Sequence, residues 1–445
     1  MHKINTNDKD KSGYMDIYVV QLGDTIYSIA DKYSISVERL ISDNGLINPY
    51  TLVVGQTIVV LYPKVTYIVK QDDTLESIAD KNGISINQLM RNNPYLYERD
   101  FIYPGDIIVI SYNSVKDLQV NGYSYVFINH DMLKRTLPYL TYLSIFNYQI
   151  AENANIVDYG DDSELIRIAK EYNSIPLLMI SAFSPSGDLD LENVYDLLLN
   201  DEKQDKLVHE MLKIVRNKGY YGINALLSNI NESNQKLYLN VLTKLSMSLR
   251  NEGYIFMITI PPNITKTDKK IIFENIDYKS FSLIVDRINF LQNVWGKNKQ
   301  PPSPISNISL IKPFIDYVTN IVSSDLLSIG KPLIGYDWEL PFSPSSSYAN
   351  SMSLESTITL AYVQQAVIYT DEESQTPYFT YTKSEQVAPE NHIVWFINAF
   401  SIKALDDVII EYNIAGSGIW NISVFYQQVW SILNAIFNIV KFPIS

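Results

Sequence analysis

The side chains that most often carry covalent or metal chemistry in proteins are scarce in this chain. None of its 445 residues is a cysteine, which excludes thiolate nucleophiles, disulfides and cysteine-based zinc sites. Its four histidines lie far apart in the sequence, so no histidine pair has the spacing of metal ligands. We expect neither a metal nor a cofactor. The remaining candidates for chemistry are carboxylates, hydroxyl groups and aromatic rings.

The charge balance narrows the classes of partner. The chain has 35 Lys and Arg against 49 Asp and Glu, a net charge of −14, which disfavours a nucleic acid. Residues 1–15 are mostly polar, without the apolar run of a secretory signal, and we expect them to be disordered or extended. The most apolar stretch, residues 429–440, is interrupted by Ser431, Asn434 and Asn438. It predicts a buried helix, and we expect no membrane partner.

Two Asp-Thr pairs, 49 residues apart, mark an internal repeat in which residues 18–32 align with residues 67–81. In each copy a short alternating strand leads into an Asp-Thr pair, whose Asp is placed to cap the next helix. Two short amphipathic helices, a glycine turn and a β-branched strand follow. The pattern predicts two βααβ units, residues 16–62 and 65–111.

This repeat resembles the LysM domain twice over, in its Tyr-x-Val opening, Asp-Thr pair, Ser-Ile-Ala helix and closing glycine turn. LysM domains bind N-acetylglucosamine-containing glycans between the first strand–helix loop and the loop after the second helix. The resemblance implies that main-chain groups bond the acetamido arms while apolar side chains cover the sugar faces. The implied groove residues are Gly23, Asp24, Thr25, Ile26, Asn48, Pro49 and Tyr50 in the first copy, and Asp72, Asp73, Thr74, Leu75, Pro94 and Tyr95 in the second. The Asp-Thr pairs could instead serve only as helix caps, or serve both roles.

Residues 119–445, which follow a short linker over residues 112–118, alternate β-like runs with helical patterns. The candidate strands are residues 124–128, 142–146, 177–181, 222–227, 255–260, 282–290, 332–336 and 418–422. Eight strands with intervening helices predict an α/β fold, a (β/α)8 TIM barrel. Residues 341–400 would form an α+β insertion with its own small sheet between strands seven and eight.

Four segments of this unit resemble glycoside hydrolase family 18, and more narrowly the LysM-bearing spore cortex hydrolases of that family. These segments are residues 330–341, 376–381, 392–396 and 418–420. The order of two LysM domains before such a barrel is itself characteristic. The resemblance implies substrate-assisted hydrolysis: a Glu at the end of strand four protonates the glycosidic oxygen. An Asp two residues earlier orients the acetamido group, whose carbonyl attacks the anomeric carbon.

The residues that this chemistry needs are replaced in this chain. By the family motif, Tyr221 stands at the first Asp position, Asn224 is retained, Leu226 stands at the orienting Asp and Ser228 at the acid Glu. On strand six, Asn293 replaces the Tyr that supports the acetamido group. A serine hydroxyl does not donate a proton at useful pH, and leucine cannot orient an amide. We therefore expect the family's mechanism to be lost.

Aromatic residues remain where the resemblance places the barrel mouth. Trp420 matches the residue that floors the central sugar subsite in the family, and stacking on an indole needs no carboxylate. Tyr336 ends the candidate strand seven and Trp338 follows it, and both could line the same cleft or be ordinary core aromatics.

The sequence favours a catalytically inactive glycan-binding or structural protein of the bacterial spore envelope (coat, cortex or surface layer). Its partner would be peptidoglycan or another N-acetylglucosamine polymer, and it would be made in the mother cell without a signal peptide. An active cortex N-acetylglucosaminidase would need a relocated acid. Glu232 and Glu339 are the candidates, although both are more simply read as solvated loop carboxylates. A third possibility is a spore-layer or appendage assembly protein that contacts other spore-envelope proteins.

Overall fold

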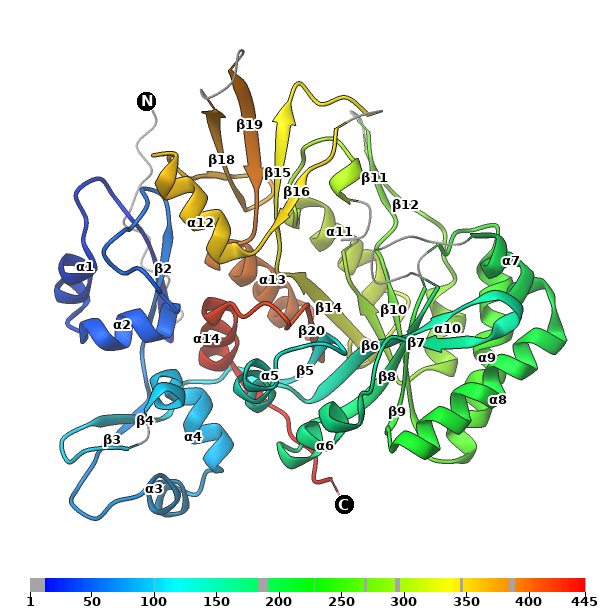
Figure 1. Cartoon of the computed structure of the whole chain (residues 1–445), viewed down its shortest axis with the longest axis horizontal. Helices are drawn as coiled ribbons and strands as arrows, with labels where there is room; N and C mark the ends of the chain where they lie inside the picture. The colour runs from blue at the N-terminus through cyan, green and yellow to red at the C-terminus, as the bar shows by residue number, and fades with distance from the viewer. Residues whose placement is uncertain are drawn as a thin grey trace.

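Two small units at the N-terminus precede a large barrel that carries an inserted sheet (Figure 1). This computed structural model describes residues 13–444, except residues 100, 183–190, 228, 268–269, 293–296, 345–346 and 384–388. Within those described ranges, no helix has both the length and the apolar character needed to cross a bilayer.

Each N-terminal unit is a two-stranded antiparallel sheet with two helices, as the repeat predicts. The first consists of β1 (Met15–Val19), α1 (Ile26–Tyr33), α2 (Val37–Asn44) and β2 (Thr57–Leu61). The second consists of β3 (Val65–Ile68), α3 (Leu75–Asn82), α4 (Ile86–Asn92), the short 3-10 helix η1 (Pro94–Glu98) and β4 (Ile107–Ser111).

The helix caps are one residue later than predicted. Thr25 and Thr74, not the preceding aspartates, are the N-cap residues of α1 and α3, and each forms a reciprocal capping box with a serine. Asp24 is held in the loop instead, because its carboxylate accepts hydrogen bonds from the Tyr18 hydroxyl (2.6 Å) and the Gln21 N–H (2.7 Å). The prediction that the aspartates cap these helices was therefore wrong.

Eight parallel strands close into the predicted (β/α)8 barrel, because β5 pairs with both β6 and β20. In ring order they are β5 (Lys116–Tyr125), β6 (Tyr142–Ile150), β8 (Ile175–Ser181), β9 (Gly222–Leu226), β10 (Ile255–Ile260), β13 (Arg287–Phe290), β14 (Leu327–Pro332) and β20 (Gly416–Trp420). The helices around them are α5 (His130–Thr136), α6 (Ser163–Glu171), α7 (Leu191–Leu199), α8 (Asp201–Lys218), α9 (Gln235–Asn251), α10 (Tyr278–Ile284), α11 (Ile308–Thr319), α13 (Ala399–Glu411) and α14 (Gln427–Ile436). Short strands β7 (Ile156–Asp158), β11 (Ile264–Lys266), β12 (Ile271–Phe273) and β21 (Phe437–Ile439) complete this region.

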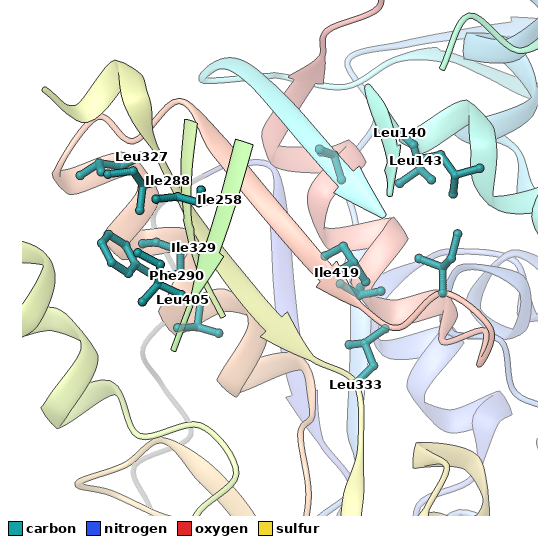
Figure 2. Packing of buried hydrophobic residues seen from close by; sticks show 14 of the residues in the cluster. Leu140, Leu143, Ile258, Ile288, Phe290, Leu327, Ile329, Leu333, Leu405 and Ile419 are labelled. Atoms are coloured by element: carbon teal, nitrogen blue, oxygen red, sulfur yellow. The ribbon is translucent and has the colours of Figure 1, made fainter. Parts of the chain in front are cut away.

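Apolar side chains fill the space between barrel strands and helices. Figure 2 shows Ile288 and Phe290 of β13, with Leu327 and Ile329 of β14, beside Leu405 of α13. All five are buried to 2% exposure or less. This packing holds the strands in place, and the mouth of the barrel lies at their C-terminal ends.

Three barrel strands differ from their predicted positions. β5 begins at Lys116, inside the predicted linker, and overlaps the predicted strand 124–128 only at its end. Part of the predicted strand 282–290 belongs to α10. The seventh strand, β14, overlaps the predicted 332–336 only at Pro332. A polar residue obscured this strand: Lys331 is fully buried because its ammonium lies 2.9 Å from the Asp406 carboxylate.

The insertion after β14 is a five-stranded antiparallel sheet with one helix. It consists of β15 (Gly335–Leu340), β16 (Asn350–Met352), α12 (Leu354–Val363), β17 (Tyr369–Asp371), β18 (Thr376–Lys383) and β19 (Glu390–Trp395), in the order β16-β15-β19-β18-β17. The sheet begins at Gly335, before the predicted residue 341, because the segment assigned to the end of barrel strand seven is its first strand.

α14 joins the N-terminal units to the barrel (Figure 1). All ten of its residues are buried, as predicted, but residues 437–439 of the apolar run form β21 and do not continue the helix. Two of the polar residues that interrupt the run, together with Gln428 just before it, make the contacts. Gln428 donates to Asn44 (2.9 Å). Ser431 donates to the Asp43 carbonyl (2.6 Å), and Asn434 accepts from Arg91 (3.0 Å). The two units are therefore fixed on the barrel by hydrogen bonds that are shielded from water.

The buried carboxyl of Asp43 should make this junction sensitive to pH. Burial raises the pKa of Asp43 to about 6, against the opposing effect of Arg39. The folded protein holds the proton on Asp43 more tightly than the unfolded chain does, in which the pKa of this carboxyl group is near 3.8. This stabilisation of the fold is fully present below pH 3.8, and it is lost as the pH rises through 6. Relative to Asp43→Asn, the parent should lose up to about 3 kcal/mol of unfolding free energy between pH 4 and 7. Urea unfolding of both proteins measures the difference; a difference independent of pH would contradict it.

Candidate functional site

In the first N-terminal unit, the loop before α1 and the loop after α2 form the walls of the implied groove. The side chains of Asp24 and Thr25 are used to build the loop, since Thr25 accepts from the Ser28 N–H (3.1 Å) and Asp24 accepts from Tyr18. Ile26 is buried in the core of the unit. The polar groups left for a ligand are therefore those of the main chain around Gly23, which has a φ of +90° that favours glycine.

Exposed apolar side chains surround these loops. Tyr50 is 77% exposed, and its ring stacks on that of Tyr27, with centroids 6.3 Å apart and planes at 28°. Leu22 and Ile47 in the same two loops are 92% and 66% exposed. Asn48 is exposed and Pro49 is half-buried. Sequence reasoning found Tyr50 but missed Tyr27, Leu22 and Ile47. These residues could have been found as apolar side chains within or next to the two predicted groove loops, where polar residues are expected.

The second unit repeats the scaffold but not this surface. Asp73 accepts from Tyr67 and Lys70, as Asp24 does from its neighbours, and the loop at Asp72 is exposed. Gln71 and Glu76 occupy the positions that correspond to Leu22 and Tyr27.

The loop after the second helix also differs from that of the first unit. Pro94 is buried there, and on the facing loop Leu75 is half-buried. Tyr95 is half-buried, with its hydroxyl donating to the Ile107 carbonyl (3.3 Å) and the Arg99 guanidinium 5.2 Å from its ring centre. The second groove therefore lacks the stacked, exposed ring pair of the first, although Phe101 and Tyr103, in the loop before β4, are 70% and 60% exposed.

Inside the barrel, a hydrogen-bonded polar layer surrounds Asn224 of β9. Its amide donates to Ser144 (3.0 Å) and accepts from Thr259 (2.9 Å). Ser144 in turn donates to Asn121 (2.9 Å), and the hydroxyls of Thr259 and Tyr123 are 3.0 Å apart. Every member is buried, so these groups hold the strands together and are not presented to a ligand.

Leu226 lies one layer further toward the barrel mouth, in the position where the family resemblance requires the orienting Asp. It packs in a cluster with Tyr123, Phe146, Met179, Leu291 and Trp420. Leu226 is 6% exposed and Trp420 is 4% exposed. The rings of Trp420 and Phe146 meet edge to face at 6.2 Å. The packing of these six side chains, the mouth cluster, leaves Leu226 and Trp420 almost no surface on which a sugar could bind.

The three aromatic residues expected at the cleft are interior residues. Tyr336, Trp338 and Trp420 are 2%, 0% and 4% exposed. The Trp338 indole donates to the Gln300 carbonyl (2.9 Å), and its ring lies 5.5 Å from that of Tyr336. Of the two roles that the sequence left open for Tyr336 and Trp338, their burial fits core packing.

Of the remaining replaced positions, the structure describes only Tyr221. Tyr221 is half-buried just before β9, at the end of the strand opposite to Leu226, with the Lys170 ammonium 5.2 Å from its ring centre. Ser228 and Asn293 lie outside the described residues.

Both alternative acids are exposed to solvent. Glu232 is exposed, and its carboxylate accepts from the Asn275 amide (3.2 Å) in a surface loop. Glu339 is exposed on β15. Neither carboxylate has the buried, apolar surroundings that tune a general acid.

Comparison with known proteins agrees with this architecture. Residues 18–61 and 67–111 match the LysM domain, and residues 108–424 match the glycosyl hydrolases family 18. The cortical fragment-lytic enzymes of Bacillus subtilis and Bacillus anthracis are similar along their whole length. The first is 32% identical, with 96% of this chain and 99% of that enzyme covered. The second is 29% identical, with the same coverage.

A solved structure has the same arrangement of domains. The crystal structure of the Bacillus megaterium spore cortex-lytic enzyme SleL superposes with a TM-score of 0.77 at 28% identity, over 96% of this chain and 99% of that chain. This similarity extends beyond the barrel to the two N-terminal units. The chain therefore belongs to the glycosyl hydrolases family 18 and carries two LysM domains ahead of its barrel.

Proposed function

We propose that this protein binds peptidoglycan or another N-acetylglucosamine polymer in the bacterial spore envelope and does not cleave it by the mechanism of its family. The observation that carries the proposal is the mouth cluster, in which Leu226 occupies the place of the orienting carboxylate among buried apolar side chains. An amide needs a hydrogen-bonding partner to be oriented, and a leucine side chain has none to offer.

The size of the expected loss supports inactivity. A general acid contributes on the order of 10²–10⁴ in rate, and Ser228 stands in its sequence position. The orienting group is replaced as well, so both contributions are removed. A filled mouth adds a further barrier, since a sugar could enter only after the packed side chains had moved.

The binding half of the proposal rests on the first LysM domain. Its loops combine main-chain polar groups with the exposed Tyr27 and Tyr50 rings, a surface on which a sugar face can stack. The LysM and family 18 domains both support an N-acetylglucosamine polymer as the ligand. The similar Bacillus enzymes are named for the spore cortex, which supports a spore-associated role.

The test measures cleavage and binding in one sample. Purified spore cortex fragments are incubated with the full-length protein for a day, with the Bacillus subtilis cortical fragment-lytic enzyme as the active control. We expect no new reducing ends above the blank, and we expect the protein to pellet with the fragments. Release of reducing ends would overturn inactivity, and Glu232→Gln and Glu339→Gln would then locate the acid. Failure to pellet would overturn binding and favour an assembly role.

A further inference from the structure

A turn of the first LysM domain touches the inserted part of the chain, which lies beside this domain in Figure 1. The turn, residues 53–56, joins the groove wall at residues 48–50 to β2. It meets Ile368, in the loop between α12 and β17, whose N–H donates to the Val54 carbonyl (2.9 Å). Val53 and Ile368 are 4% and 5% exposed and belong to one hydrophobic cluster. The turn is therefore held from outside its own domain.

The two segments approach so closely that only glycine fits between them. Gly55 has a φ of +88°, a conformation that favours glycine. A Cβ atom at this position would overlap the Ile368 carbonyl oxygen and lie 2.8 Å from the carbonyl carbon. Because these atoms belong to the backbone, they cannot rotate away as the end of a side chain would. Any larger residue would therefore push the turn and the insertion apart.

The same turn connects the two walls of the groove. The Gly55 N–H donates to the Val20 carbonyl (2.9 Å), and the Val20 N–H donates back to the turn (2.9 Å). Val20 leads directly into the first wall, at Leu22, while the turn itself follows Tyr50 of the second wall. A displacement of the turn is therefore passed to both walls.

The second LysM domain has the same turn without this support. The Gly105 N–H donates to the Val69 carbonyl (2.9 Å), and Gly105 has a φ of +98°. A Cβ atom on Gly105 would meet no atom of the described residues within 4 Å, apart from its chain neighbours. The turn thus forms without an outside contact, so the contact at Ile368 is not needed to make the turn itself.

We propose that the inserted part of the chain is a brace that positions the groove of the first LysM domain, through the contact of Ile368 with Val54 and Gly55. This inference rests on the proposed function, because that groove is the glycan-binding site proposed there. Since α14 already holds α2 of the domain through Gln428 and Ser431, the brace leaves both walls ordered before a polymer binds. A preorganised site loses less conformational entropy on binding and so binds more tightly. Ile368 is thus a positioning residue, without contact to the glycan.

The experiment breaks the brace from each side in the full-length protein. Gly55→Ala pushes the turn away, and Ile368→Pro removes the N–H that the brace donates. Ile368→Val keeps this N–H, and Gly105→Ala places an alanine in the same backbone conformation at the unsupported turn. Each variant is also made in a Tyr27→Ala/Tyr50→Ala background. Binding is measured by co-sedimentation with insoluble β-1,4-linked N-acetylglucosamine polymer, and thermal melting confirms that each variant folds.

We expect Gly55→Ala and Ile368→Pro each to weaken binding by about fivefold, the loss that results when one or two groove side chains must be ordered on binding. Ile368→Val and Gly105→Ala should stay within about twofold of the parent. In the Tyr27→Ala/Tyr50→Ala background the two brace variants should cause no further loss of binding, although they still lower the melting temperature. This difference separates positioning of the groove from a general loss of stability.

Unchanged binding by the folded brace variants would overturn the inference and leave the LysM proposal standing. A further loss in the Tyr27→Ala/Tyr50→Ala background would also overturn it, because the brace would then act elsewhere than on the groove. Full binding by the Tyr27→Ala/Tyr50→Ala parent would overturn the LysM proposal, and the inference with it. If Gly55→Ala prevents folding, Ile368→Pro, which leaves the LysM sequence unchanged, gives the decision.

Discussion

Leu226→Asp is expected to lower the free energy of unfolding by about 4–6 kcal/mol at pH 7.5, because it places a carboxylate among packed apolar side chains. Leu226 is 6% exposed in a cluster with Trp420, Phe146 and Met179. Burial would raise the pKa of the new carboxyl group. The variant should therefore be least unstable below the unfolded value near 3.9, and should lose stability as the pH rises through its raised folded value.

Urea unfolding of the parent, Leu226→Asp and Leu226→Asn at pH 4 and pH 7.5 measures this effect. The asparagine variant has nearly the same shape as the aspartate variant but no charge, so it separates the cost of a polar group from that of a charge. We expect a strong pH dependence for the aspartate variant only. An aspartate variant as stable as the asparagine variant at pH 7.5 would show that water reaches the mouth, and would contradict the filled cleft.

The same packing predicts that restoring the family's residues does not restore hydrolysis. Leu226→Asp/Ser228→Glu returns both missing carboxylates in sequence terms. The mouth cluster would still occupy the space for the sugar, since Met179, Leu291 and Phe146 come from other strands. Reducing-end release from cortex fragments should stay at the blank level. Release by this variant would show that the two substitutions alone account for the loss.

The sequence predicted the architecture well because the signals for it are local. Repeats, alternating apolar runs and turn residues identified both LysM domains and the barrel. The errors concern polar residues inside strands and helices, whose partners come from distant parts of the chain. Lys331 lies inside a barrel strand because Asp406 of α13 is 2.9 Å away. Similarly, Asn434 reads as an interruption of an apolar helix, but its partner is Arg91 of the second LysM domain.

The site was harder to predict than the fold because it depends on residues that are distant in sequence. Substitution at Leu226 could be read from the motif, but the closing of the mouth depends on side chains from several strands. The inserted sheet likewise depends on the register of β15, β17, β18 and β19, which no single segment specifies. Tyr27 was overlooked because it lies in the first turn of α1, next to the buried Ile26, and the sequence does not show that its side chain faces the groove.

The two LysM domains should contribute unequally to binding, and this is the largest effect that we expect on retention by the polymer. In the first domain the exposed Tyr27 and Tyr50 rings stack on each other between exposed Leu22 and Ile47. Tyr27→Ala/Tyr50→Ala should therefore weaken co-sedimentation with cortex fragments by more than about tenfold, since two stacking rings are lost. Both residues are more than half exposed, so the fold should be little affected.

The matched change in the second domain should have a much smaller effect. Glu76 corresponds to Tyr27, and Tyr95 is half-buried beneath the Arg99 guanidinium, so neither presents a free ring face to a sugar. Glu76→Ala/Arg99→Ala should change binding by less than about threefold, because charged surface side chains contribute little to a neutral stacking contact. Conversely, Glu76→Tyr supplies the missing ring at the position that Tyr27 occupies in the first domain, and should strengthen binding. Equal losses in the two domains would show that the main-chain loops, which both domains share, and not the exposed rings, hold the glycan.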